Sequence, residues 1–207
     1  MLNEKMIKRE IIERFQSTAD EISERYRLEL ERSFPQYRSE AGTGLLQAIE
    51  SAGRKYQKAE NAGETGPLEW IWLSFLRSSL LDDAPCYRID LYDAKGRLSE
   101  GEYAEMWDYS YVFQPYYEIE KKIMDLAERQ NRLKPCEIND ILSRISVSFR
   151  KTADRQIIQI FHSIHLELVP MAAEGKSLKI MLGDYMDEAE LIDEVWYGEM
   201  EERSLER

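Results

Sequence analysis

The chain contains 207 residues, carries a formal net charge of −12 and is 43% hydrophobic. That apolar fraction suffices for a core and excludes a disordered chain. The sequence has no run of about 18 uncharged apolar residues, which excludes a membrane span, and its first ten residues lack the apolar segment of a signal peptide. We therefore expect a folded cytoplasmic protein.

The negative charge is concentrated toward the C-terminal end. Residues 171–207 contain 4 basic and 11 acidic side chains, a net charge of −7, whereas residues 1–66 contain 11 basic and 12 acidic side chains. Binding to nucleic acid or to an anionic membrane surface needs a concentrated basic face. The sequence indicates no such face, so we expect neither nucleic acid nor a membrane as a partner.

Residues 3–32 are predicted to form one long amphipathic helix. Apolar side chains recur three or four residues apart, and charged side chains fill the positions between them. The apolar positions are Ile7, Ile11, Phe15, Ala19, Ile22, Tyr26 and Leu30. This stripe needs a partner along its length, which is either the chain's own core or a second copy in a coiled-coil homodimer.

Pro35 is predicted to end this first helix, because proline lacks the N–H that would continue the helical hydrogen bonds. A second helix is expected at residues 43–60. The loop that follows, residues 61–67, contains two glycines and a proline. It predicts a helical N-terminal arm, residues 1–62, and an α+β core, residues 67–207.

The apolar run at residues 70–75 predicts a strand, because strand side chains alternate between two faces. Trp70 and Trp72 would lie on one face, and Ile71, Leu73 and Phe75 on the other. A strand that is apolar on both faces needs cover on both. The alternative is a helix over residues 67–81, with Pro67 at its first position.

Residues 86–92 alternate between apolar and polar side chains, which predicts a half-buried strand. The turn at residues 82–85 would join it to the preceding strand, in a hairpin or meander over residues 68–96. Residues 178–182 resemble a further short strand that could join this sheet. We therefore expect an α+β fold that is predominantly helical, with a small antiparallel sheet.

The rest of the chain is predicted to be mainly helical. The aromatic run at 103–117 fits a strand or a helix, and Pro115 is expected to begin a helix that reaches about residue 132. Residues 136–172 have the strongest helical period, in one helix or in two divided near Thr152 as an N-cap. From about residue 187 we expect an acidic helix with Leu191, Ile192, Val195 and Trp196 as its apolar face.

His162 and His165 are the only histidines and form the candidate metal site. Three residues apart, they occupy neighbouring positions on one helix and could hold zinc or iron. Glu167 points to another side of that helix, so carboxylate ligands would have to come from elsewhere, such as the acidic tail. Two histidines with ordinary hydrogen bonds are the simpler interpretation.

Motifs for catalysis and for nucleotide binding are absent: the sequence has no Walker A, no GxGxxG, no GxSxG and no HExxH. No cofactor is predicted. The aromatic run fits a core boundary, a stacking pocket or a protein-binding surface. We expect a non-enzymatic protein–protein interaction or regulatory module, with a protein partner that the acidic tail suggests is basic, and with self-association through the N-terminal helix. The alternative is a metal-dependent or small-molecule-binding enzyme that uses His162 and His165.

Overall fold

A computed structural model describes residues 2–129 and 133–197. The chain divides into two compact units, and each takes two stretches of sequence. The helical unit comprises Met1–Gln36 and Ser110–Arg155, and the sheet unit comprises Tyr37–Tyr109 and Gln156–Arg207. The loop at residues 61–67, from which an arm and a core were predicted, lies inside the sheet unit.

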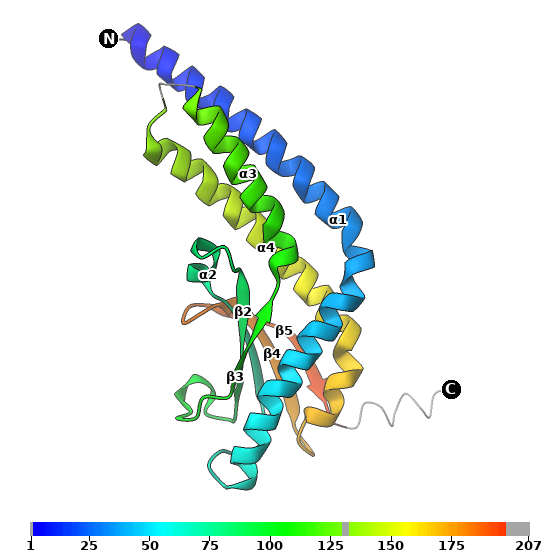
Figure 1. Cartoon of the computed structure of the whole chain (residues 1–207). Helices are drawn as coiled ribbons and strands as arrows, with labels where there is room; N and C mark the ends of the chain where they lie inside the picture. Colours follow the sequence, from blue (N-terminus) through cyan, green and yellow to red (C-terminus); the bar gives the residue numbers. More distant parts are fainter. Residues whose placement is uncertain (1, 130–132, 198–207) are drawn as a thin grey trace. The chain divides into compact units, whose positions relative to one another are not determined.

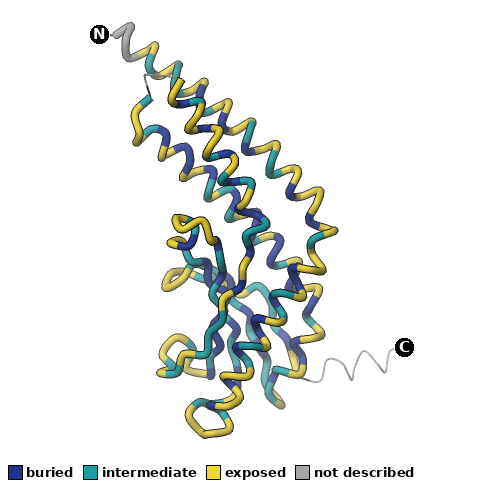
Figure 2. Tube along the Cα trace, in the orientation of Figure 1, coloured by how far each residue is buried: buried dark blue, intermediate teal, exposed yellow. Residues whose placement is uncertain are grey.

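The helical unit consists of the first part of α1 (Leu2–Asn61), α3 (Ser110–Glu128) and the first part of α4 (Pro135–Leu168) (Figure 1). Apolar side chains of all three helices are buried, as the dark blue segments of Figure 2 show. They include Phe15, Ala19, Leu30 and Phe34 on α1, Phe113, Ile119 and Ile123 on α3, and Ile141, Ile145 and Phe149 on α4. Of the predicted stripe of α1, Phe15, Ala19 and Leu30 are buried, Ile11, Ile22 and Tyr26 are partly buried, and Ile7 is 42% exposed. The homodimer remains a prediction.

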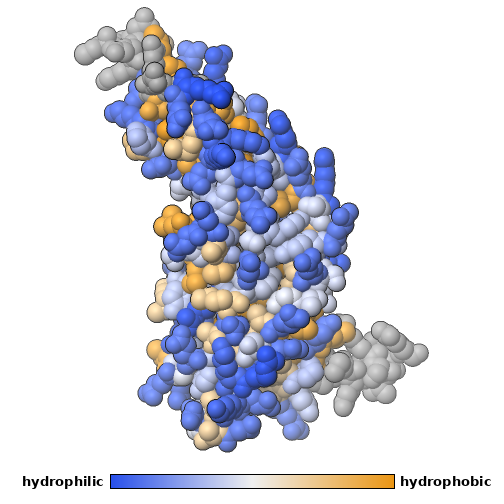
Figure 3. Space-filling model, in the orientation of Figure 1, coloured by the Kyte–Doolittle hydropathy of each residue, from blue (hydrophilic) through white to orange (hydrophobic). Residues whose placement is uncertain are grey.

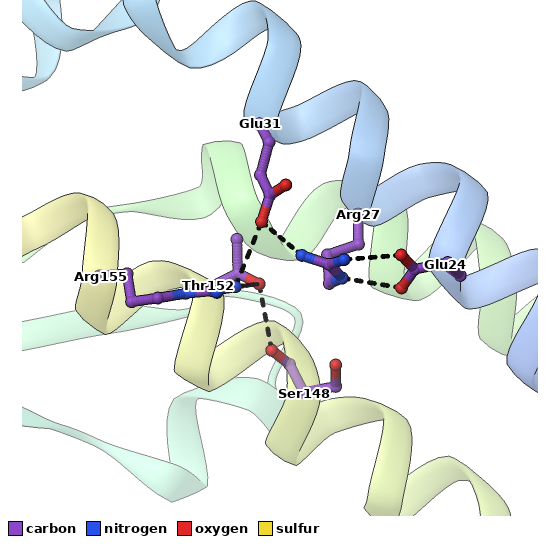
Figure 4. A network of polar contacts seen from close by, with 6 residues as sticks. All are labelled: Glu24, Arg27, Glu31, Ser148, Thr152 and Arg155. Atoms are coloured by element: carbon purple, nitrogen blue, oxygen red, sulfur yellow. Dashed lines mark hydrogen bonds and ion pairs between the residues drawn. The ribbon is translucent and has the colours of Figure 1, made fainter.

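A polar network connects α1 to α4 within the helical unit (Figure 4). Arg27 donates to the Glu24 carboxylate at 2.6 and 2.8 Å and also pairs with Glu31. Arg155 donates to Glu31 at 3.2 Å. These side chains are partly exposed, and exposed ion pairs stabilise a fold by at most about 1 kcal/mol each. The network thus helps to align two helices whose association depends on their apolar faces.

Pro35 lies inside α1, so the predicted helix end there is wrong and the second predicted helix is the continuation of the first. Proline removes one main-chain hydrogen bond and crowds the preceding turn. Burial on both sides of the proline outweighs this penalty. Leu30 and Phe34 before it, and Ala41 and Leu45 after it, are all at most 5% exposed.

One other helix boundary differs from the prediction, and one alternative is decided. The helix expected to start at Pro115 begins five residues earlier, at Ser110. Helix α4 is a single helix, and Thr152, the predicted N-cap of a second one, lies within it. Its hydroxyl donates to the carbonyl oxygen of Ser148 at 3.2 Å, four residues back, which is a bond that helical threonines commonly make.

The sheet unit contains one five-stranded sheet in the order β3-β2-β1-β4-β5. Its strands are β1 (Trp70–Phe75), β2 (Cys86–Tyr92), β3 (Ala104–Asp108), β4 (Ser177–Asp184) and β5 (Ala189–Trp196). The predicted α+β class, the hairpin and the extra strand at 178–182 are confirmed. The sheet is mixed rather than antiparallel, because β4 runs parallel to β1. The alternative helix over residues 67–81 is wrong for 70–75, and only α2 (Arg77–Leu81) is helical there.

The acidic helix predicted from residue 187 is wrong, because residues 189–196 form β5. A β-bulge interrupts its pairing with β4: Ile180 pairs with Asp193 and Met181 with Leu191, which leaves Ile192 as the extra residue. Residues 198–207 of the predicted helix lie outside the described residues.

The two faces of the sheet differ in burial. The face covered by the later part of α1 and by α4 (Figure 1) is apolar, with Ile71, Leu73, Ile89, Leu91, Ile180 and Val195 all at most 1% exposed. Small residues on α1 permit close packing of the two helices. A Cβ atom on Gly42 would lie 3.3 Å from Cγ2 of Ile164, so even an alanine there would require the Ile164 side chain to shift by a few tenths of an ångström.

No helix within residues 2–129 and 133–197 has an apolar stretch long enough to traverse a bilayer. On the side of the molecule drawn in Figure 3, hydrophilic side chains predominate. Apolar side chains that remain exposed are therefore the exceptions that need an explanation.

Candidate binding face of the sheet

The face of the sheet turned away from α1 and α4, here called the open face, carries aromatic, charged and exposed apolar side chains. Strand by strand it presents Ala104 and Met106, then Arg88, Asp90 and Tyr92, then Trp70, Trp72 and Ser74, then Lys179, Met181 and Gly183, and last Ala189, Leu191, Glu194 and Trp196. Met106, Leu191 and Trp196 are 50%, 52% and 51% exposed. Exposed apolar groups beside charged ones are typical of surfaces that bind another protein.

Two cations lie over the tryptophans at the centre of the open face. The guanidinium carbon of Arg97 is 4.0 Å from the centre of a Trp72 ring, and Nζ of Lys179 is 4.7 Å from that of Trp70. Tyr92 meets Trp72 edge to face, with ring centres 6.4 Å apart and planes at 81°. Contacts of this geometry are attractive because a ring has a negative face and a positive edge.

Arg97 also joins two loops above the sheet. It belongs to the loop between β2 and β3, and its Nη1 donates to the main-chain oxygen of Asp187 in the turn between β4 and β5, at 2.9 Å. That turn needs glycine at its start, because a Cβ on Gly183 would lie 2.2 Å from the carbonyl oxygen of Glu188. The sequence thus builds a tight turn that presents a carbonyl to Arg97.

A buried ion pair lies beside the tryptophans. Arg88 donates to both carboxylate oxygens of Asp90, at 2.9 and 3.0 Å, and to Glu102 at 2.6 Å. Asp90 is 4% exposed, and the Tyr185 ring lies 5.3 Å from the Arg88 guanidinium carbon. The pair holds the centre of the open face together and fixes one positive group within it.

Burial and charge shift the pKa values of this pair. Burial raises the pKa of the Asp90 carboxyl, and the neighbouring Arg88 offsets only part of that rise. Burial acts to lower the pKa of Arg88, but hydrogen bonds to Glu102 and Asp90 outweigh it and keep the guanidinium charged. Burial raises the pKa of Tyr92, and the negative charge of Asp90 raises it further. The tyrosine therefore serves as a neutral ring and hydroxyl.

The loop that carries Arg97 is held at its base by Asp93, which is 6% exposed. Its carboxylate accepts from the Lys95 amide at 2.9 Å, from the Ser99 hydroxyl at 2.7 Å and from the Gly66 amide at 3.2 Å. Burial acts to raise the pKa of Asp93, but these hydrogen bonds outweigh it and the pKa lies below its ordinary value. The fold of the loop therefore depends on Asp93, and Arg97 extends from it as a separate contact.

The predicted metal pair lies on α4, on the other side of the sheet. His162 is exposed, while His165 is partly buried and its Nδ1 lies 2.9 Å from Oδ2 of Asp193 on β5. This carboxylate comes from the acidic C-terminal region, but it contacts the histidine ring itself. Residues 2–129 and 133–197 contain no group of three or more His, Cys, Asp or Glu side chains placed to hold a metal ion. Metal binding by His162 and His165 remains a prediction.

The aromatic run at 103–117 contributes mainly to the interior. Trp107 and Tyr109 are 4% and 0% exposed and stack with ring centres 4.6 Å apart. The Tyr109 hydroxyl donates to Gln156 Oε1 at 2.8 Å. The aromatic groups on the open face come instead from Trp70, Trp72 and other strand positions. The alternation in β1 had separated these tryptophans from the inner face, but it gave no sign that their own face would be uncovered.

Cavities also lie elsewhere in the described residues. One in the sheet unit, of about 450 Å³, is lined by Arg54, Tyr56, Leu68 and Met171 among others. One in the helical unit, of about 860 Å³, follows a single helix, α1, and includes the carboxylates of Glu13, Asp20, Glu21 and Glu24.

Comparisons of this chain with family models, with curated proteins and with solved structures found no match.

Proposed function

We propose that the protein is a non-enzymatic protein–protein interaction module, and that the open face of the sheet is its binding surface. The observation that carries this proposal is the exposure of Met106 on β3 and of Leu191 and Trp196 on β5, at the two edges of the sheet face that α1 and α4 do not cover. Large apolar and aromatic groups at a surface are the usual anchors of protein interfaces. Charged groups around them give such an interface its specificity.

The charge of the molecule favours a partner with basic groups. Around the open face and its turns lie the carboxylates of Asp90, Glu102, Asp184, Asp187, Glu188 and Glu194, against the cations Arg77, Arg88, Arg97 and Lys179. The whole chain carries a net charge of −12. A field of that sign accelerates encounters with basic surfaces and opposes acidic ones.

The test is affinity capture with quantitative mass spectrometry, using the full chain and two matched variants. Leu191→Asp places a charge on the open face, and Val147→Asp places one at an equally exposed apolar position of the helical unit, since both side chains are 52% exposed. We expect a captured protein to fall about tenfold with Leu191→Asp and to persist with Val147→Asp. An identical captured set for all three proteins would contradict the proposal, provided that circular dichroism shows each to be folded.

A second function has one supporting contact, the pairing of His165 with Asp193 at 2.9 Å. It would make the protein a metal-dependent enzyme that uses His162 and His165. Elemental analysis of the same purified proteins distinguishes the two proposals: one equivalent of zinc or iron that is lost in a His162→Ala/His165→Ala variant would favour the enzyme.

A further inference from the structure

We propose that the ring face of Trp72 is a binding position for an arginine side chain of a partner peptide segment, and that Arg97 occupies this position in the free protein. This inference rests on the proposed function, because it assigns one contact within the open face. It also gives the loop between β2 and β3 a role, since displacement of Arg97 would be part of binding.

The surroundings of the Arg97 guanidinium suit that group in particular. It has an aromatic ring 4.0 Å below it, and Nη1 donates in its plane to the Asp187 carbonyl oxygen at 2.9 Å. A planar cation can stack through its face and donate hydrogen bonds through its edge at the same time, which an ammonium group cannot do. A second arginine placed here could make the same two contacts.

Arg97 can leave without unfolding its loop. The loop depends on the hydrogen bonds to Asp93, and the Arg97 side chain is exposed. Its two direct contacts are with a ring and a carbonyl oxygen, and it also interacts with the charge of the Asp90 carboxylate. Stacking of an exposed cation on a ring is a weak interaction, so a competing arginine needs little advantage to replace it.

The charge balance favours an incoming cation once Arg97 has moved. The six carboxylates named above would then be opposed by Arg77, Arg88 and Lys179 and by the exposed Lys95 of the same loop. A deficit of positive charge around an aromatic face attracts a basic side chain.

The two tryptophans indicate a peptide rather than an isolated cation. The indole nitrogens of Trp70 and Trp72 are buried and have no hydrogen-bond acceptor among the described residues. A buried donor without an acceptor is unfavourable. A peptide segment that brings an arginine also brings main-chain carbonyl oxygens, which are the kind of acceptor that these two indole N–H groups lack.

The test uses the full chain and three capped tripeptides, Gly-Arg-Gly, Gly-Lys-Gly and Gly-citrulline-Gly. Citrulline has nearly the shape of arginine without its charge. Binding is followed by the indole N–H resonances in two-dimensional NMR, with the Trp72 signal assigned from a Trp72→Phe variant. That variant keeps a ring and should bind the arginine peptide more weakly than wild type, because the phenylalanine ring attracts cations less well.

We expect Arg97→Ala to bind the arginine peptide about three to five times more tightly than wild type, because the resident competitor is gone. Lys95→Ala is the matched control: it removes an exposed positive charge from the same loop, two residues away. It should bind like wild type. The citrulline peptide should bind several times more weakly than the arginine peptide.

Equal affinity of wild type and Arg97→Ala for the arginine peptide would overturn the inference, as would equal binding of the citrulline peptide or an unmoved Trp72 signal. These results would leave the proposed function standing if capture still depended on Leu191. If capture of partner proteins did not depend on Leu191 but the peptide results were as expected, the open face as a protein interface would be contradicted. The arginine-binding position on Trp72 would still stand.

Discussion

The two faces of the five-stranded sheet are built from alternate residues of the same strands and yet have different chemistry. On the inner face, Ile71, Leu73 and Ile89 are at most 1% exposed and lie beneath two helices. On the open face, their immediate neighbours include two tryptophans with cations stacked on them and a buried ion pair. Neighbouring residues of one strand therefore have different roles: one stabilises the fold, and the next is available for binding.

The largest expected difference between the faces is in stability. Leu73→Ala on the inner face should lower the free energy of unfolding by about 3 to 4 kcal/mol, because it leaves a cavity under the helices. Met106→Ala on the open face, where the side chain is 50% exposed, should change it by less than about 0.5 kcal/mol. Urea denaturation followed by tryptophan fluorescence measures both. Similar losses for the two variants would show that the open face is also part of the core.

The ion pair tests whether the open face is stabilised by its own charges. Arg88→Ala would leave the Asp90 carboxylate buried without its partner, which should cost about 2 to 3 kcal/mol at pH 7. This expected loss of stability is smaller than the loss for a fully buried ion pair, because the Arg88 side chain is 17% exposed.

The pH dependence of this loss follows from the raised pKa of Asp90. A carboxyl with a raised folded pKa binds its proton more tightly in the folded state, so protonation relieves the unpaired charge. The deficit of Arg88→Ala should therefore shrink as the pH falls from 7 to about 4. Glu102→Ala is the control, because its exposed side chain should have little effect. A pH-independent deficit would mean that packing, and not charge, explains the loss.

Replacing Asp93 should lower the stability by less than replacing Arg88. The pKa of Asp93 is also shifted in the opposite direction to that of Asp90. The folded pKa of Asp93 is lowered, so its contribution is present above the ordinary aspartate pKa of about 4 and is lost as the pH falls through the folded pKa. Asp93→Asn keeps the shape but weakens four hydrogen bonds to a carboxylate, and it should cost about 1 to 2 kcal/mol at pH 7. Thermal melting of wild type and variant between pH 3 and 7 should converge at the acid end. Melting temperatures of wild type and Asp93→Asn that still differ at pH 3 would contradict the role assigned to the Asp93 carboxylate.

Much of the sheet could be predicted because its pattern is local. The alternation in residues 70–75 assigned Trp70 and Trp72 to one face and Ile71, Leu73 and Phe75 to the other, as the register confirms. The parallel partner of this strand was less accessible to prediction. Strand β4 pairs with β1 from more than 100 residues away, and periodicity does not report which strands meet.

The errors have local physical causes. In β5 the bulge at Ile192 shifts the alternation by one residue, so that Leu191, Ile192 and Val195 take on a helical spacing in the sequence. At Pro35 the burial of flanking residues, which depends on the tertiary structure, overrides the preference of proline. The open face itself was missed because apolar residues were assumed to be covered, and exposure is a property of the arrangement of elements rather than of the sequence pattern.

The parallel pairing of β1 with β4 has a consequence for the order of assembly during synthesis. When the ribosome has completed residue 170, β1 and β2 exist, but the neighbour that will occupy the remaining edge of β1 has not yet been made. That edge belongs to one of the most apolar strands of the chain and is open to pairing with other nascent chains. Once residues 177–184 have been made and released, β4 pairs with this edge of β1 and closes it.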